Sequence, residues 1–392
     1  MIEIIDKSMC MGCTACSSIC PKQCISMEYD EEGYKYPHVN KSMCIDCKLC
    51  EKVCPCKKEF VFDDFVTRAY AVQNKNKKIR EESASGGAFS TLAENFIRKG
   101  GVVYGVAFDE DFSVSHIRVE TIEELRKLRG SKYVQSDMKD NFLLVKQDLK
   151  EGRKVLFSGT PCQIAGLASF LRGVYPTNNL FLVDLVCHGI PSPLLWNKFI
   201  SNLQQKYGKL EYASFRNKHF GYAGSTMAMR FADGKMRYTE RDIQFYKKLF
   251  FDDINTRPSC FKCHFKTIKR ISDFTIFDCW HVNEIDKLLD DDKGTTWVLV
   301  QSAKGLDYFE QVRKQVNVVE APVDKAIELD GMLATHCTTP NPQRDEFFKD
   351  IQVHGFDGLL DKYFPMTMKK RIVNIVKPIF GKIGLIKILK RL

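Results

Sequence analysis

The amino-acid sequence predicts a small α+β domain, then an α/β domain with a mixed or mostly parallel sheet, and finally a basic helical tail. Three observations predict this organisation. Ten of the 16 cysteines precede residue 57, strand-like and helix-like segments alternate over residues 65–345, and residues 362–392 contain no Asp or Glu. At roughly 150 residues per domain, 392 residues are enough for two or three domains. We therefore expect domains at residues 1–60 and 65–345, with the tail at 362–392.

Composition excludes several classes of protein. With 44% hydrophobic and 28% charged residues, the chain is neither disordered nor fibrous. No uncharged apolar run approaches the roughly 18 residues of a spanning helix, and the N-terminus lacks the apolar core of a signal peptide. The expected location is therefore cytoplasmic, where 16 cysteines indicate metal binding rather than disulfides. The positive charge is not interleaved with aromatic residues, so no nucleic-acid partner is expected.

The first domain contains a cysteine repeat with a period of 34 residues. Cys10-x2-Cys13-x2-Cys16-x3-Cys20-Pro21 recurs as Cys44-x2-Cys47-x2-Cys50-x3-Cys54-Pro55. Three closely spaced thiolates bind three irons of one cubane, and the fourth cysteine, before proline, binds the other cluster. This spacing predicts two [4Fe-4S] clusters, the first held by Cys10, Cys13, Cys16 and Cys54 and the second by Cys44, Cys47, Cys50 and Cys20.

Residues 1–60 thus resemble a bacterial-type two-cluster ferredoxin. Structural zinc, the alternative, uses four ligands in two pairs and does not explain an eight-cysteine repeat with proline after each fourth cysteine. Cys24 and Cys56 fall outside the pattern and are interpreted as spare thiols.

The second domain begins with a Ser/Gly loop at residues 83–90, followed by a helix that ends at Gly100 and Gly101. Glycine at a helix N-terminus allows a phosphate to approach the backbone, although the same residues also serve as ordinary caps. Buried strands at residues 154–159 and 180–186 lead into Cys162 and Cys187. Open α/β sheets place ligand sites at such carboxyl ends of strands.

Several motifs of this domain together resemble one known family. They are SASGGAFS (83–90), GSKYVQS (130–136), SGTPCQIAGL (158–167), VDLVCHGIPSP (183–193), FRNK (215–218) and the pair Cys260 and Cys263. The family is the beta subunit of deazaflavin-reducing (coenzyme F420) hydrogenases and formate dehydrogenases. The resemblance implies an electron-transfer enzyme that contains FAD and a [4Fe-4S] cluster beside the flavin. Where the family tends to read Gly-Asp-Phe-Trp-Gly, this chain reads Phe277-Asp278-Cys279-Trp280-His281, without either glycine.

The resemblance also implies specific site residues. Cys162, Cys187, Cys260 and Cys263 make a four-thiolate set for a third cluster, with Cys279 as a substitute ligand. The alternatives are that Cys162 and Cys187 are buried small hydrophobes and that Cys260 and Cys263 form half of a zinc site.

Ser85, Gly86 and Gly87 would hold the FAD pyrophosphate, with Lys132 and Tyr133 near the flavin ring. Thr160 and Gln163 would donate hydrogen bonds to the cofactor or cap a helix. His188 would relay a proton or bond a sulfur. Arg216 and Lys218 would hold an acidic group or be an ordinary basic loop.

Two functional hypotheses follow. In the first, the protein is a flavin-dependent oxidoreductase that passes electrons between ferredoxin-type clusters and an organic two-electron substrate. In the second, it is an electron-transfer subunit of a larger complex without a substrate of its own. The redox partner would be a ferredoxin or another oxidoreductase subunit.

The tail carries nine Lys or Arg residues opposite an apolar face, with Pro378 in its middle. This pattern favours peripheral attachment of the tail to the anionic inner face of the membrane. The alternative is a terminal helix packed on the body or on a partner.

Overall fold

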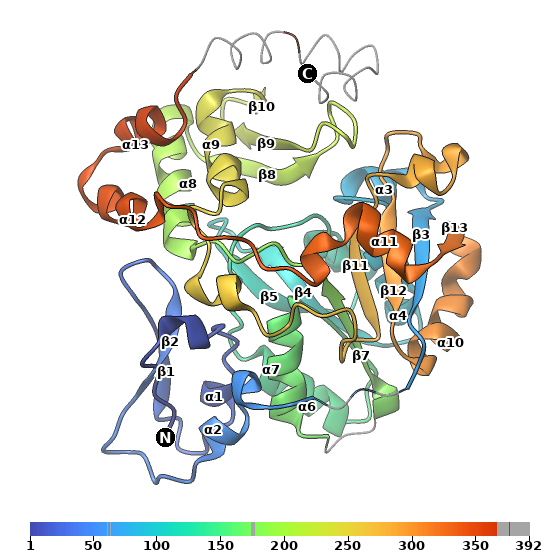
Figure 1. Ribbon diagram of the computed structural model, residues 1–392, viewed down its shortest axis with the longest axis horizontal. Helices are drawn as coiled ribbons and strands as arrows, with labels where there is room; N and C mark the ends of the chain where they lie inside the picture. Colours follow the sequence, from blue (N-terminus) through green and yellow to red (C-terminus); the bar gives the residue numbers. More distant parts are fainter. Residues whose placement is uncertain (61, 63, 174–176, 367–375, 377–392) are drawn as a thin grey trace.

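The computed structural model describes residues 1–60, 62, 64–173, 177–366 and 376 (Figure 1). The basic tail predicted at residues 362–392 therefore lies almost entirely outside the described residues. In the described part of the chain, no helix has both the length and the apolar character needed to cross a membrane.

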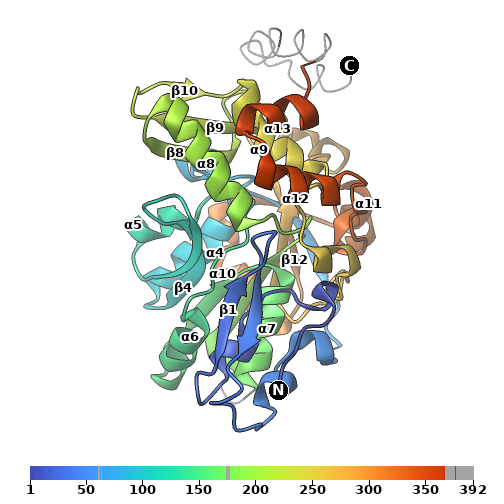
Figure 2. The same cartoon turned by 90° about the vertical axis from the view of Figure 1, so that its left-hand side faces the viewer.

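The cysteine-rich segment, which we call the ferredoxin module (residues 1–60), combines two short helices with one hairpin (Figure 2). Helices α1 (Ala15–Ser18) and α2 (Leu49–Lys52) each begin within one copy of the cysteine repeat. Between them, β1 (Ile25–Tyr29) and β2 (Lys35–Val39) pair antiparallel. This segment thus combines helix and strand.

The large domain is built on an eight-stranded sheet of order β13-β3-β12-β11-β7-β6-β4-β5. Its centre, β4-β6-β7-β11, is parallel, and the outer pairs are antiparallel, so the prediction of a mixed sheet is confirmed. The strands are β3 (Arg68–Asn74), β4 (Val102–Phe108), β5 (Val114–Val119), β6 (Val155–Ser158), β7 (Leu180–Leu185), β11 (Phe274–Asp278), β12 (Thr296–Val300) and β13 (Val316–Ala321).

Both faces of this sheet are covered because successive strand residues point to opposite sides. On β4 and β6, Val103 and Leu156 pack with α4 (Ala88–Arg98) and α10 (Ala303–Val312). Their neighbours Val102 and Val155 pack instead with α6 (Asn141–Lys150) and α7 (Pro161–Leu171). Helix α11 (Val323–Asp330) packs through Ala326 against Trp297 and Leu299 of β12. Shorter helices are α3 (Lys77–Glu82) and α5 (Ile122–Leu125).

The ferredoxin module packs directly on the large domain. Ala15 of α1 and Val53, which follows α2, are fully buried in the same apolar cluster as Phe142 of α6 and Leu167 of α7. Burial of α1 and of Val53 in the apolar cluster that includes α7 fixes the cysteine loops relative to the large domain.

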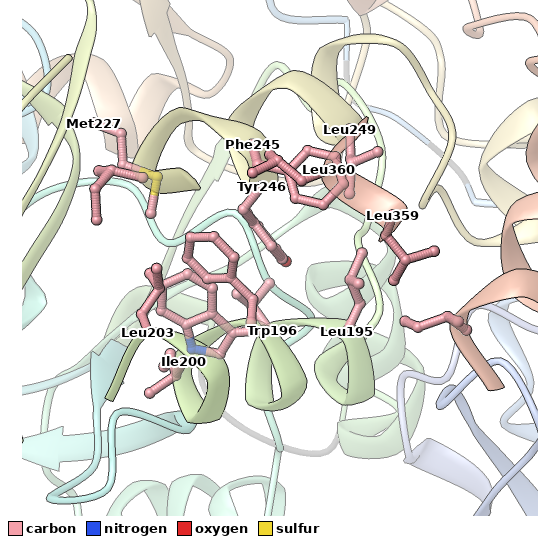
Figure 3. Packing of buried hydrophobic residues seen from close by; sticks show 14 of the residues in the cluster. Leu195, Trp196, Ile200, Leu203, Met227, Phe245, Tyr246, Leu249, Leu359 and Leu360 are labelled. Atoms are coloured by element: carbon pink, nitrogen blue, oxygen red, sulfur yellow. The ribbon is translucent and has the colours of Figure 1, made fainter. Parts of the chain in front are cut away.

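A further layer consists of residues 193–251, inserted between β7 and β11, and of residues 344–363, which follow β13. The sequence pattern did not predict it as a separate unit. Its sheet of order β10-β9-β8 packs with four helices around Trp196 and Tyr246, whose ring centroids lie 4.9 Å apart (Figure 3). The elements are β8 (Leu210–Asn217), β9 (Thr226–Phe231), β10 (Met236–Arg237), α8 (Pro193–Tyr207), α9 (Arg241–Phe251), α12 (Arg344–Val353) and α13 (Phe356–Tyr363).

Candidate functional site

The backbone of the ferredoxin module repeats with the same period as its cysteines. Gly12 and Asp46, which are 34 residues apart, both have positive φ. Two residues further along each loop, Thr14 and Lys48 also have positive φ. The amides of Cys20 and Cys54 also form equivalent hydrogen bonds. Each donates to the carbonyl of the residue three positions earlier, Ser17 or Glu51, at 3.2 Å. The two loops therefore present their thiols in the same way, as two equivalent cluster sites require.

The second predicted cluster set lines one cavity. Cys20, Cys44, Cys47 and Cys50 surround it, so the structure brings the fourth cysteine of the first repeat to the three of the second. The amide of Ile2 donates to the Cys50 thiol at 3.2 Å. Cys47 is exposed, whereas Cys50 is buried. This site therefore lies at the protein surface.

The first set lies deeper. Cys16 is close enough to Cys10 and Cys54 to interact electrostatically, and Cys13 interacts in the same way with Cys10 and Cys16. Burial raises the pKa of the Cys16 thiol to about 12. A group of thiols held protonated by burial must release protons when it binds iron as thiolates.

The four thiols predicted for a third cluster also line a single cavity. Cys162 comes from the first turn of α7, Cys187 follows β7, and Cys260 and Cys263 belong to a short turn after α9. Burial raises the pKa of Cys162 to about 12 and that of Cys187 to about 11. Three segments distant in sequence thus converge on one thiol-lined space.

Two cations missed by the sequence analysis line the same cavity. The Lys266 ammonium donates to the carbonyls of Cys187 and Leu333, and Arg270 donates to the Leu185 carbonyl at 3.0 Å. Arg270 is also paired with the buried Asp184 at 3.2 Å, so the Lys266 ammonium is the charge that suits an anionic cluster. In the described part of the chain, no group of three or more Cys, His, Asp or Glu side chains is placed to hold a single metal ion. The donor set fits a cluster in which each thiolate binds a different iron.

Four cysteines remain outside the three predicted ligand sets. Cys279 is buried in an apolar cluster with Phe277 and Trp297, away from the cavity for which it was the proposed substitute ligand. Cys337, which the sequence did not single out, accepts a hydrogen bond from the Cys263 amide at 3.3 Å. Cys24 lies 3.3 Å from the Cys20 sulfur, and Cys56 packs against the apolar cluster around Cys162.

The three thiol sets form a series. Cys16 of the first set packs in the same apolar cluster as Cys50 of the second, and Cys13 lies against Gly166, one helical turn after Cys162 of the third. The order from the surface inward is therefore second set, first set, third set.

A separate polar group surrounds Arg216 at the end of β8. Its guanidinium pairs with Asp278, the last residue of β11, at 2.7 Å and donates to the Tyr133 hydroxyl at 3.2 Å. It also lies 4.6 Å from the centre of the Trp280 ring. The Arg216 Nε atom is buried and has no hydrogen-bond partner among the described residues. We call Arg216, Asp278, Tyr133, Tyr222 and Trp280 the Arg216 cluster; Tyr222 donates to Asp278 at 2.9 Å and stacks on Trp280.

Lys218 joins this cluster to the Ser/Gly loop. Its ammonium donates to the carbonyls of Ser85, Lys293 and Arg80 at 2.5–2.8 Å. Burial, together with nearby arginines, lowers its pKa to about 7. Among the described residues, the carboxylates of Asp278 and Asp291 act on Lys218 electrostatically but do not form an ion pair with it, so an anionic ligand here would add a direct counter-charge.

The Ser/Gly loop is fixed by its neighbours. Ser85 donates to the Thr295 carbonyl at 2.5 Å and lies 3.3 Å from the Tyr222 hydroxyl. The Gly86 amide donates to Thr296, and a Cβ on Gly86 would lie 2.2 Å from the Val72 carbonyl oxygen. That amide is therefore engaged within the protein. Gly87, with φ of +84°, is the N-cap of α4.

Thr160 and Gln163 form a capping box at the start of α7. The Thr160 hydroxyl lies 3.2 Å from the Cys162 sulfur, and Gln163 donates to Ser136 at 2.9 Å. Both side chains are thus engaged in the cap, which was the alternative reading, and a cofactor role for either stays a prediction.

Lys132 and His188 occupy different surroundings. The Lys132 ammonium donates to two carbonyls of its own loop at 2.9 Å, and burial lowers its pKa to about 7. His188, which lines the third thiol cavity, lies 3.1 Å from an oxygen of Asp253. Phe250 lies between His188 and Tyr133, with centroid distances of 4.7 and 4.4 Å. A continuous run of rings therefore joins the third thiol cavity to the Arg216 cluster.

The fold and the thiol sets define an iron–sulfur protein of the oxidoreductase type. Residues 9–58 match the 4Fe-4S dicluster domain. Residues 69–141 and 152–326 match the N-terminal and C-terminal regions of the coenzyme F420 hydrogenase/dehydrogenase beta subunit. These two regions of one family cover more than half of the chain, which therefore belongs to that family.

Other comparisons add little. A search of curated proteins gives no match. A solved structure of the F420-reducing NiFe hydrogenase complex from Methanosarcina barkeri is similar at 15% identity, over 78% of this chain and 93% of the matched chain, with a TM-score of 0.43.

Proposed function

We propose that this protein transfers electrons between the two clusters of its ferredoxin module and an FAD bound at the Arg216 cluster, through a third [4Fe-4S] cluster at Cys162, Cys187, Cys260 and Cys263. The observation that carries the proposal is the unbroken series from exposed Cys47 through three thiol sets to His188, Phe250 and Tyr133. When bound, clusters supply one-electron transfer, and a flavin supplies exchange between one-electron and two-electron chemistry.

The Arg216 cluster and the residues next to it have distinct roles in this proposal. Lys218 would hold the anionic part of the cofactor, because it is buried and bonds to neutral carbonyls. The Ser85–Gly87 loop would position Lys218 through the Ser85 carbonyl, since the Gly86 amide is already bonded to Thr296. Asp278 orients Arg216, whose remaining buried donor, Nε, is available for a polar ligand atom. Tyr133 and Lys132 would lie near the flavin ring, where a cation favours an anionic reduced state.

His188 is the proposed proton carrier. Asp253 holds one ring nitrogen, and Phe250 packs on the imidazole, so the ring is fixed between the third thiol cavity and the Arg216 cluster. A histidine fixed in this way would hold or donate a proton for a two-electron substrate.

A redox partner would dock at the second cluster. Cys47 is exposed, and so are the side chains of Met43 and Ile45 beside it. A partner's cluster could approach this loop more closely than either of the other two thiol sets. A ferredoxin or another oxidoreductase subunit fits this surface.

The alternative is an electron-transfer subunit without a substrate of its own. In that case the protein would copurify with a stoichiometric partner and would turn over no soluble acceptor.

The experiment that tests the proposal is anaerobic purification and reconstitution, followed by iron and flavin analysis. We expect about twelve irons and one FAD per chain. The reconstituted protein is then titrated separately with reduced ferredoxin, a reduced nicotinamide and a reduced deazaflavin. Bleaching of the flavin band by one of them supports the first function. Absence of flavin from reconstituted protein contradicts it.

A further inference from the structure

Arg257 is wholly buried where the ferredoxin module meets the large domain. It precedes Pro258 and the pair Cys260 and Cys263 of the third thiol set. Its backbone holds that segment in place, since its amide donates to the Ile190 carbonyl and its carbonyl accepts from the Cys260 amide, both at 2.9 Å.

The guanidinium lies against the loop of the first cluster. Its Nε donates to the Cys10 carbonyl at 2.8 Å, and its terminal nitrogens donate to the Lys35 carbonyl at 3.0 Å and to Gln135 at 3.1 Å. A Cβ on Gly12 would lie 3.1 Å from one terminal nitrogen. Glycine between Cys10 and Cys13 thus leaves room for the cation beside two of the proposed ligands.

All of these hydrogen-bond partners are neutral. Among the described residues, no carboxylate lies within ion-pair distance of Arg257. A guanidinium keeps its proton in proteins, and a buried charge without a counter-charge is strongly unfavourable. The guanidinium also lies 4.2 Å from the centre of the Tyr36 ring and 5.2 Å from that of Tyr34, but neither ring carries a neutralising charge. A negative charge that the described residues do not supply would therefore stabilise this site further.

Arg344 provides a direct comparison. It is also buried and also joins the large domain to the ferredoxin module, but its partner is the Glu32 carboxylate. The fold thus supplies a carboxylate for one of the two arginines at this junction and none for the arginine beside the thiols.

We propose that Arg257 is the counter-charge of the clusters on either side of it, the first ferredoxin cluster and the third cluster, and that it raises the reduction potentials of both above that of the second cluster. This inference rests on the proposed function, since it requires clusters at these thiol sets. Four thiolates make a cluster anionic, and reduction adds negative charge, so a nearby cation in a poorly screened interior favours the reduced form. Electrons would then be drawn inward from the exposed second cluster.

The test is a redox titration monitored by electron paramagnetic resonance on the full-length reconstituted protein. In Arg257→Gln, the potentials of the first and third clusters should fall, while the second cluster keeps its potential. Arg257→Lys, which retains the charge, should stay close to the wild type. Arg344→Gln, the matched control, removes the Glu32 ion pair and should leave all potentials unchanged. Unchanged potentials in an Arg257→Gln protein with full iron content would overturn the proposal.

A second variant covers the case in which Arg257→Gln does not assemble its clusters. Gln135→Glu keeps the side-chain shape and places a carboxylate against the guanidinium. It should lower the potentials of the first and third clusters, and unchanged potentials would again contradict the proposal. Iron analysis separates the two proposals, because a wild type with only about eight irons would refute the third cluster. In that case, the change in the reduction potential of the first cluster in Arg257→Gln would still test the proposed role of Arg257.

Discussion

The sulfur of Cys13 packs against Gly166, so closely that a Cβ on Gly166 would lie 3.0 Å from it. Gly166 is on α7, four residues after Cys162, so both residues lie on the same side of that helix. The contact brings a thiol of the first set beside the helix that carries a thiol of the third set. Only glycine allows this approach.

The Gly166→Val substitution should push the first cluster loop away from α7. Overpacking of this kind typically costs about 1–3 kcal/mol. We expect a lower melting temperature and loss of iron from the first cluster, with the second cluster retained, as measured by iron analysis and spin quantification. Gly355→Ala is the control, because nothing lies within 4 Å of the added Cβ. Full iron content and unchanged stability in Gly166→Val would refute this reading.

Replacement of Cys162 by alanine should remove one cluster. Because Cys162 lines the third cavity with three other thiols, iron should fall from about twelve to about eight per chain. Cys279→Ala should keep about twelve irons, since Cys279 packs among apolar side chains outside that cavity. Unchanged iron in Cys162→Ala would exclude it as a ligand.

Arg216→Gln should weaken flavin binding without loss of iron. The variant removes a charged donor from the cluster and leaves Asp278 without the partner that lies 2.7 Å away. Hydrogen bonds to charged groups contribute about 1.5–3 kcal/mol, so flavin affinity should fall roughly tenfold or more. Fluorescence titration with FAD measures this. Arg230→Gln, whose pair with Glu211 is exposed on the same small sheet, should bind FAD normally.

His116 should make stability depend on pH below neutrality. Burial lowers the pKa of His116 to about 4, below its ordinary value of 6.5. Between these values the unfolded chain binds a proton that the folded protein does not, so stability falls as the pH drops from 6.5 towards 4. The loss from this residue should be about 2 kcal/mol between pH 7 and pH 5.

His116→Gln should remove that part of the pH dependence. Chemical unfolding of both proteins at several pH values measures the slope, which is independent of any constant loss caused by the substitution. Identical slopes for the two proteins would show that His116 does not titrate as stated.

The basic tail gives a prediction from the sequence alone. With nine Lys or Arg and no acidic residue, residues 362–392 should attract anionic lipids. Removal of residues 366–392 should abolish binding to anionic liposomes at low salt while flavin and iron content stay the same. If the full-length protein does not bind such liposomes, the membrane role of the tail is wrong.

The sequence by itself determined the cysteine loops of the ferredoxin module. Their ligands follow one another within a few residues, so spacing predicts which thiols belong together, and the structure adds that Gly12 and Asp46 share a positive φ. The sequence also predicted the parallel strands β6 and β7, because they are short apolar runs followed within a few residues by Cys162 and Cys187. The family resemblance based on the motifs around those cysteines was confirmed.

Tertiary structure decided which distant residues meet. The insertion between β7 and β11 brings Arg216 and Lys218 to Asp278 and the Ser/Gly loop, and no local pattern encodes that contact. The same holds for Lys266 beside the third cavity and for Arg257 beside Cys10, each of which reads in sequence as an ordinary basic residue. Short-range ligand spacing is set by the backbone, whereas burial and charge pairing depend on the packing of segments that lie between 62 and 247 residues apart.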